Sequence, residues 1–359
     1  MKINSKANLK GQRKDNKLSN GFKHKLIPTK PLNLSAANTI ENLLKQMSLT
    51  SFGARSLGES ADILYQMAKD KDCFIVLTLS GAMTVAKMGL VICDMIEHNM
   101  ADAIVSTGAI IAHAFVEATG NVHFKINPEL NDLELYHYGY DRIYDTLELE
   151  KSLNDVEILI EKVLKKIPRA KVLSSVYLNE ILGKYLAENY KDKRNVLKSA
   201  YIKKVPVYIP AFTDSELGLD VGLFNRKAAS KKESTFLFDS YIDLDHFTNL
   251  IEQQKKIGIF TVGGGVPRNW AQQVCPYLDI LKKRLDKKVS FKRYLYGVRI
   301  CPEPPHWGGL SGCTYQEGIS WGKFTPVSEG GRWAEVYADA TIAWPIIVKA
   351  VLERLEKDE

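Results

Sequence analysis

The chain alternates short apolar runs with helical patterns, and each apolar run ends in small or polar residues. Phe74–Leu79 is a run of apolar and β-branched residues that ends at Ser80–Gly81. Apolar residues at helical spacing follow from Met83 to Met95, and a second run, Ala103–Val105, ends at Ser106–Gly108. This order is typical of a β-α-β unit, in which a helix joins two parallel strands.

The same signal recurs through the rest of the chain. Apolar runs lie at 205–209, 257–262, 294–300 and 334–337, and helical patterns lie at 155–166, 173–189 and 341–356. Strands of this kind are buried on both faces by helices. We therefore predict an α/β fold with a doubly wound, mainly parallel, Rossmann-like sheet. A helical lead-in at 39–47 and 60–69 would precede it, and the polar segments 121–152 and 222–240 are predicted to be irregular.

Positive charge is concentrated at the N-terminus. Residues 1–30 hold nine Lys and Arg against one acid, Asp15, whereas the whole chain carries a net charge of +7, so residues 31–359 are close to neutral. Phe22 is the only Phe, Tyr or Trp of residues 1–30, so the stacking side chains of a nucleic-acid-binding segment are missing. We predict a disordered, solvated arm over residues 1–30 and no nucleic-acid partner.

The five cysteines include no C-x-x-C pair, which argues against a disulfide framework and a zinc ribbon. Cys301, His306 and Cys313 lie close together in the sequence but lack a fourth ligand, so no metal site is predicted. No apolar run approaches the roughly 20 residues that a membrane helix needs. We expect a cytoplasmic protein with no membrane contact.

Small and polar residues follow several of the predicted strands. They include Ser80–Gly81, Ser106–Gly108, Thr213–Asp214, Gly263–Gly265 and Asp339. In an open α/β sheet, ligands bind beyond the carboxyl ends of the strands, and glycines there let backbone N–H groups approach phosphate. Five such ends favour a nucleotide-sized ligand, although the dinucleotide fingerprint G-x-G-x-x-G is absent.

Lys323 lies in an unusual local sequence. It follows Trp321 and Gly322, and Glu317 stands six positions upstream. A lysine beside an aromatic ring, on a backbone freed by glycine, can lose its hydration, which lowers its pKa and supplies a neutral amine for attack on a carbonyl or imine. The alternative is a surface lysine after a packed tryptophan, and the tetrapeptide alone does not separate the two.

Five sequence motifs, taken together in their order along the chain, help to separate the two interpretations of Lys323. They are the stretch from Glu97 to Ala109 (EHNMADAIVSTGA), Pro210–Asp214, Gly263–Val266, Glu317–Lys323 and Val336–Ala340. Together they resemble the deoxyhypusine synthase family over roughly residues 30 to 355. The resemblance implies that residues 31–359 form a single NAD-binding catalytic domain. It also implies a homotetramer with active sites at a dimer interface.

The resemblance also implies roles for individual residues. Lys323 would be the catalytic lysine, and Glu317, Trp321, Asp220 and Asn269 would bind the substrate. The NAD-binding positions would be Thr84, Ser106, Thr107, Gly108, Asp214, Gly263, Gly264, Gly265, Asp339 and Ala340. The implied reaction oxidises a polyamine such as spermidine and carries its aminobutyl group, as an imine on Lys323, to an acceptor amine. A protein lysine of a translation factor is the expected acceptor, which gives deoxyhypusine.

The chain departs from the family pattern around the substrate. Ala112–His113 stands where the eukaryotic synthases have an acidic pair, Asn269 replaces a histidine, and Leu310 replaces an aspartate. The acid near Asp220 is missing or shifted by one position. These changes match the divergent, deoxyhypusine synthase-like branch, which is related to homospermidine synthase. They leave open a free diamine as acceptor, or a catalytically silent paralogue that assembles with an active synthase.

Overall fold

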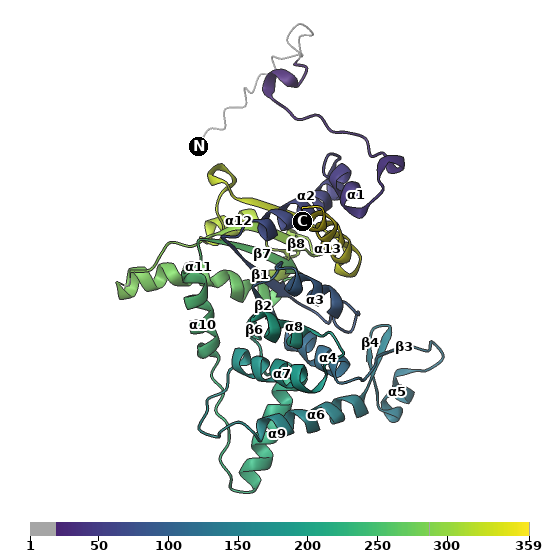
Figure 1. The fold of residues 1–359 in the computed structure, drawn as a ribbon, viewed down its shortest axis with the longest axis vertical. Helices are drawn as coiled ribbons and strands as arrows, with labels where there is room; N and C mark the ends of the chain where they lie inside the picture. The colour runs from purple at the N-terminus through teal and green to yellow at the C-terminus, as the bar shows by residue number, and fades with distance from the viewer. Residues whose placement is uncertain (1–18, 287, 359) are drawn as a thin grey trace, which may run out of the picture.

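The computed structural model describes residues 19–286 and 288–358, and a six-stranded parallel sheet runs through its centre (Figure 1). The strands are β1 (Cys73–Leu79), β2 (Ala103–Ser106), β6 (Val207–Tyr208), β7 (Lys256–Val262), β8 (Tyr294–Ile300) and β9 (Arg332–Val336). Their spatial order is β6-β2-β1-β7-β8-β9, and every neighbouring pair is parallel. This is the order of a Rossmann sheet, in which the winding reverses between β1 and β7. The predicted fold class is confirmed.

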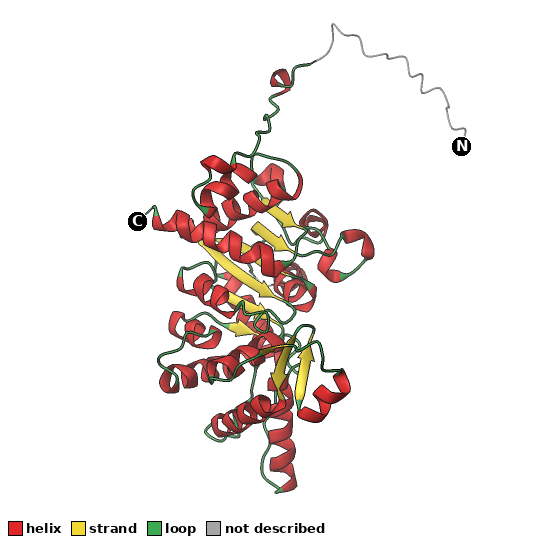
Figure 2. Cartoon of the chain, turned by 90° about the vertical axis from the view of Figure 1, so that its right-hand side faces the viewer, coloured by secondary structure: helices red, strands yellow, loops and turns green. Residues whose placement is uncertain are grey.

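Helices cover both faces of this sheet (Figure 2). They are α1 (Ile40–Met47), α2 (Phe52–Lys69), α3 (Gly89–Glu97), α4 (Gly108–Ala118), α5 (Asp132–Tyr138), α6 (Glu150–Leu164), α7 (Ser175–Asn189), α8 (Val196–Lys203), α9 (Glu216–Ser230), α10 (Ser240–Glu252), α11 (Gly265–Leu285), α12 (Tyr315–Ser320) and α13 (Ala340–Glu356). The helix predicted from Met83 begins only at Gly89, because residues 83–87 form turns, and Lys87 has a φ of 66°.

Alternate residues of each strand pack into two separate cores. Leu77 and Leu79 belong to a large cluster with residues of α2, α3 and α13, whereas Val76 belongs to a second cluster with residues of α10 and α11. Successive side chains of a strand point to opposite faces, so one apolar run supplies both cores. This double burial explains why the strands read as continuous apolar segments.

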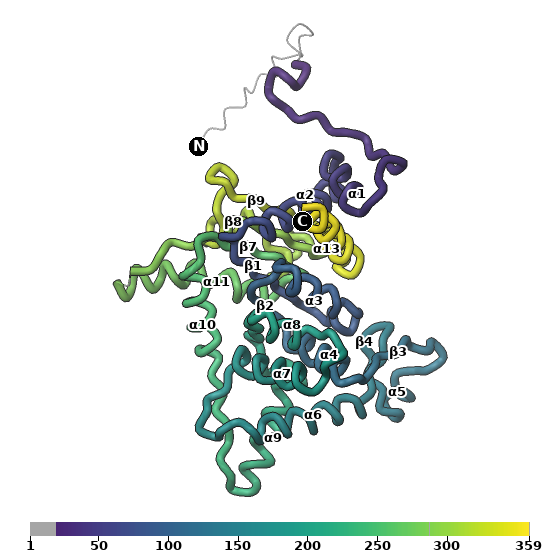
Figure 3. The backbone as a smooth tube through the Cα atoms, in the orientation of Figure 1, coloured from purple at the N-terminus to yellow at the C-terminus, as the bar shows by residue number. Residues whose placement is uncertain are grey.

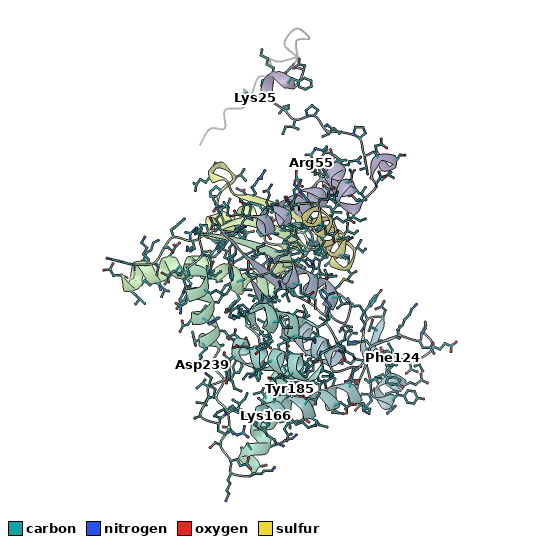
Figure 4. All side chains as sticks on the ribbon, viewed as in Figure 1. Lys25, Arg55, Phe124, Lys166, Tyr185 and Asp239 are labelled. Atoms are coloured by element: carbon teal, nitrogen blue, oxygen red, sulfur yellow. The ribbon has the colours of Figure 1, made fainter. Side chains whose placement is uncertain are left out.

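The two segments predicted to be irregular contain regular secondary structure. Residues 121–152 contain α5 and a small antiparallel sheet of β3 (Phe124–Lys125), β5 (Thr146–Leu149) and β4 (Tyr140–Ile143). This insertion projects from one side of the molecule, where Phe124 is labelled (Figure 4). Helix α9 extends to Ser230, where the polar pattern suggested a loop. Its Lys227 pairs with Glu157 and Glu161 of α6, so these charges lie on a solvated helix face.

The N-terminal segment runs away from the folded body (Figure 3). Residues 1–18 of the predicted arm lie outside the described residues. Residues 22–30 are exposed, and the backbone N–H of Lys30 donates to the carbonyl of Leu49. No helix within residues 19–286 and 288–358 is long and apolar enough to cross a membrane.

A buried carboxylate fixes the chain beyond β6. Asp243 of α10 accepts hydrogen bonds from Ser175 N and Oγ at 3.0 and 2.7 Å and from Val176 N at 2.9 Å. The Ser175 hydroxyl in turn accepts from Ile209 N at 2.8 Å, directly after β6. These bonds join α7, α10 and the strand end, so the carboxylate sets the path of the loop that leads to Asp214.

We expect Asp243→Ala to lower the free energy of unfolding by about 3 kcal/mol, because it leaves buried N–H groups without an acceptor. The same change at Asp245, which is exposed on the same helix, should cost less than about 0.5 kcal/mol. Urea unfolding followed by circular dichroism measures both values. Equal stability of the two variants would contradict the role assigned to Asp243.

Candidate active site

The backbone around Lys323 is held in place on both sides. Thr314 is the N-cap of α12, and its hydroxyl accepts a hydrogen bond from Glu317 N at 3.1 Å. The chain then turns through Gly322 at a φ of 68°. Lys323 N donates to Gly318 O at 3.0 Å, and Lys323 O accepts from Tyr294 N at 2.9 Å. The lysine therefore leaves a helix end and joins the start of β8, which leaves its backbone little freedom.

The side chain of Lys323 is buried. The residue is 7% exposed, its Nζ donates to Asn269 Oδ1 at 3.0 Å, and Nζ lies 5.8 Å from the centre of the Trp321 ring system. Burial lowers the pKa of this amine, and the nearby Arg268 guanidinium lowers it further, against opposing contributions from Cys313, Cys275 and Glu317. The surface alternative for Lys323 is therefore wrong.

Lys323 lies in the wall of a cavity of about 300 Å³. The lining residues are Arg268, Asn269, Gln272, Gln273, Pro305, Gly308, Gly309, Leu310, Cys313, Glu317, Trp321 and Lys323. Three of the predicted substrate residues, Glu317, Trp321 and Asn269, are thus brought to the lysine. Trp321 is 63% exposed, so it is not a core aromatic and its ring is free to contact a ligand.

Asp220 is not among the residues that line this cavity. It lines a different cavity of about 160 Å³, together with Ala112, Glu157 and Glu216. Burial raises the pKa of its carboxyl to about 7, and the charges of Glu157 and Glu216 add to the rise. Within one copy of the chain, the predicted role of Asp220 beside Lys323 therefore has no support.

Two buried residues of α11 that line the cavity were not predicted from the sequence as site residues. Arg268 and Gln272 are 2% and 3% exposed, and both line the cavity of Lys323. Arg268 donates from Nη1 to Ser311 O at 3.3 Å, whereas its Nε and Nη2, and Nε2 of Gln272, have no hydrogen-bond partner among the described residues. Their spacing of four residues, directly after the triple glycine, places them on one helix face and could have identified them.

The loops that follow the strands are bonded to one another. Ser80, which follows β1, donates from its backbone to Val262 O at 3.1 Å, and its hydroxyl donates to Gly264 O. Thr107 N donates to Leu79 O at 3.1 Å and its hydroxyl to Gly81 O at 3.0 Å. The predicted strand-end residues after β1, β2 and β7 therefore lie together at the carboxyl ends of these strands, where the winding of the sheet reverses.

The triple glycine is required by close packing and by backbone conformation. Gly263 and Gly265 have φ angles of 78° and 62°, which favour glycine, and a Cβ on Gly264 would lie 2.5 Å from Ser311 Cα. Helix α11 starts here without a side-chain cap. Its first N–H groups have no partner within the helix, and such a terminus favours an anionic group.

The other predicted cofactor-binding residues differ in their exposure and in the hydrogen bonds that their side chains already make. Thr84 and Ser106 are buried, and their hydroxyls already donate to backbone carbonyls at 2.8 and 2.9 Å. Asp339 caps α13, which begins at Ala340, by accepting from Thr341 N at 2.7 Å. Asp214 is exposed in the turn before α9.

Gly108 has a packing role. A Cβ on it would lie 2.3 Å from the side chain of Ser215, so glycine lets the start of α4 approach the start of α9.

The fold and the site together define a Rossmann-type domain with a buried lysine that lines a cavity near its glycine-rich turn. The family model that describes deoxyhypusine synthase matches residues 42–351. The chain belongs to the deoxyhypusine synthase family.

Individual relatives agree with this assignment. The chain is 34% identical over 327 residues to "Probable deoxyhypusine synthase 2" of Methanosarcina mazei, covering 91% of this chain and 90% of that protein. It is 35% identical over 321 residues to "Deoxyhypusine synthase-like protein" of Chlorobaculum parvum, covering 89% and 88%. A crystal structure described as "a putative deoxyhypusine synthase from Entamoeba histolytica" shares the fold, with a TM-score of 0.56 and 14% identity over 90% of this chain and 96% of that one.

The lowered pKa of Lys323 has a measurable effect on stability. Below this pKa both the folded and the unfolded chain carry the ammonium, and the folded protein bears the full cost of burying it. As the pH rises from the folded-state pKa towards about 10.4, the folded chain loses its proton first and the cost disappears.

Lys323→Met should therefore unfold with a free energy about 1 kcal/mol higher than wild type at pH 7, and this gain should shrink as the pH approaches 10.4. Urea unfolding at several pH values measures the difference, with Lys283→Met on the exposed face of α11 as the control. A gain for Lys323→Met that is the same at all pH values would contradict this interpretation.

Proposed function

We propose that this protein is an NAD-dependent aminobutyl transferase that moves the aminobutyl group of spermidine, through an imine on Lys323, to an acceptor amine. The observation that carries the proposal is the buried Lys323, whose pKa is lowered and whose Nζ faces a cavity. A desolvated lysine is the group that forms imines with carbon electrophiles. Membership of the deoxyhypusine synthase family supports aminobutyl transfer in general.

The residues at the strand ends fit NAD. The N-terminus of α11 follows the triple glycine without a side-chain cap, at the reversal point of the sheet, where dinucleotides bind in such folds. Gly263–Gly265 would hold the pyrophosphate, and Asp214 and Asp339 are exposed carboxylates that can accept from ribose hydroxyls. NAD, when bound, supplies the acceptor for oxidation of the polyamine and the donor for reduction of the final imine.

Lys323 acts as the carrier between these two redox events. Its neutral Nζ attacks the imine carbon of the oxidised polyamine and forms a new C–N bond. The original C–N bond breaks, and with spermidine the diaminopropane amine leaves with a proton. Attack by the acceptor amine on the Lys323 imine then returns Nζ as a free amine and places the aminobutyl group on the acceptor.

The remaining residues of the cavity serve substrate recognition. Glu317 is the only carboxylate among the described residues that line the cavity, and the exposed Trp321 ring lies beside Lys323. A carboxylate and an aromatic face are the groups that bind a primary ammonium. The extended polyamine would place its terminal ammonium at these two residues and its secondary amine near Lys323.

We favour a protein lysine, as in deoxyhypusine formation, as the acceptor, with a free diamine as the second candidate. The second candidate rests on the small number of acids: Leu310 lines the cavity where the family pattern has an aspartate, and Asp220 lies elsewhere. Asp220 would bind the substrate only if copies of the chain form a tetramer whose active sites combine residues from two chains. A silent paralogue is disfavoured because the chain retains Lys323, Glu317 and Trp321, and these three residues line one cavity.

The first test traps the covalent imine. Purified protein incubated with NAD and spermidine, then reduced with borohydride, should gain one aminobutyl group on Lys323, as measured by intact mass and peptide mapping. Lys323→Ala should gain none there, because no other described lysine lines this cavity. A folded wild-type protein that binds NAD but forms no adduct with spermidine would contradict the transfer and favour the silent paralogue.

The second test concerns the glycine turn. Gly264→Ala should weaken NAD binding at least tenfold, because its Cβ would approach Ser311 Cα to 2.5 Å and shift the start of α11. Gly222→Ala in α9 is the matched control, since its Cβ meets nothing within 4 Å. Titration calorimetry with NAD measures both affinities, and equal affinities would remove the turn from the proposed cofactor site.

A further inference from the structure

Two histidines and a glutamate meet where the small antiparallel sheet packs against α4. His113 comes from α4, His123 directly precedes β3, and Glu148 comes from β5. One nitrogen or oxygen atom of each lies within 4.8 Å of the other two. His113 Nδ1 is 2.6 Å from Glu148 Oε2, and His123 Nε2 is 3.4 Å from Glu148 Oε1.

The path of the backbone brings these three side chains together. Strands β3 and β5 are antiparallel with Phe124 opposite Leu147, so His123 and Glu148 follow as the next facing pair. His113 lies one and a half turns into α4 and approaches from the main domain. The three side chains are 8% (His113), 0% (His123) and 1% (Glu148) exposed. The cluster is therefore a buried junction between the insertion and the body of the protein.

The buried atoms that converge here lack ordinary partners. His113 Nδ1, His123 Nε2 and Glu148 Oε1 have no hydrogen-bond partner among the described residues. The 2.6 Å contact between His113 Nδ1 and Glu148 Oε2 is an ion pair when the imidazole is protonated, and it does not involve Glu148 Oε1 or His123 Nε2. Buried polar atoms are satisfied almost without exception, so three orphaned atoms that converge indicate a missing partner of positive charge.

A hydrogen-bonded ion-pair network is the competing explanation, and the groups around His123 bear on it. Glu117 Oε1 lies 3.5 Å from His123 Nδ1, so it can accept a hydrogen bond from a protonated Nδ1, and the unprotonated Nε2 is then available as a ligand. A carboxylate behind a histidine is the usual outer partner of a metal ligand. Lys87 Nζ also lies 2.8 Å from His123 Nδ1 and forms an ion pair with Glu117. A protonated Nδ1 cannot accept a hydrogen bond from Lys87, so in that state the ammonium bonds to the Glu117 carboxylate alone.

We propose that His113 Nδ1, His123 Nε2 and the Glu148 carboxylate bind one divalent first-row transition-metal ion, such as Zn²⁺. Two imidazoles and one carboxylate are a ligand set that such ions prefer, with water completing the coordination. The site ties residues 121–149 to α4, which begins at the strand-end residue Gly108. This inference stands apart from the transfer reaction and replaces the sequence-based prediction of no metal.

The test uses the full-length chain without an affinity tag, first stripped with a chelator. Titration with Co²⁺ should produce visible absorbance that saturates at one equivalent and is displaced by Zn²⁺. His123→Gln and Glu148→Gln should each weaken binding at least tenfold. His137→Gln removes an exposed histidine of α5 in the same insertion and should bind as the wild type does.

Two readouts guard against a variant that merely fails to fold. Zn²⁺ should raise the Tm of wild type and His137→Gln but not that of Glu148→Gln, and it should slow proteolysis within residues 121–149 of the wild type. Anomalous scattering from wild-type crystals soaked in Zn²⁺ should peak between the three side chains. No metal binding by folded wild type, unchanged affinity in both variants, or a peak elsewhere would overturn the proposal.

Discussion

The close approach of Gly264 to Ser311 is the contact on which the site depends. Any side chain at this position would collide with the backbone of the loop that follows β8, since even a Cβ would lie 2.5 Å from Ser311 Cα. The approach lets Ser311 O accept from both Arg268 and Arg299, which holds the loop against α11 and β8. One glycine thus connects the turn after β7 with the wall of the lysine cavity.

Helix α11 links the glycine turn to Lys323 and to the second core. Its first residue completes the triple glycine, Asn269 one turn later holds Lys323, and Ala271 and Cys275 pack into the second core under the sheet. A helix anchored in a core moves as a rigid unit. Groups at its N-terminus and at the lysine therefore keep a fixed separation, as the proposed transfer between a cofactor and a covalent carrier would require.

Local patterns predicted the elements of this arrangement better than they predicted its contacts. Strands such as β1 were found because burial on both faces leaves an uninterrupted apolar run. The insertion was misread because its strands, such as Phe124–Lys125, are too short for periodicity to register. The contact between His113 and Glu148 joins residues 35 positions apart, and only the folded register brings them together. Motif resemblance located Lys323 and Asn269, but it could not show that Asp220 lines another cavity.

The identity of residue 269 shapes the chemistry open to Lys323. Asn269 accepts a hydrogen bond from Nζ at 3.0 Å, but an amide does not titrate and cannot take a proton from the lysine. Burial and the charge of Arg268 both lower the pKa of Lys323, which makes its proton easier to remove. In the proposed reaction, protons released during attack would pass to the substrate amine, to water or to Glu317, which lines the same cavity. The lowered pKa of Lys323 is thus compatible with a site that has an asparagine where the family pattern has a histidine.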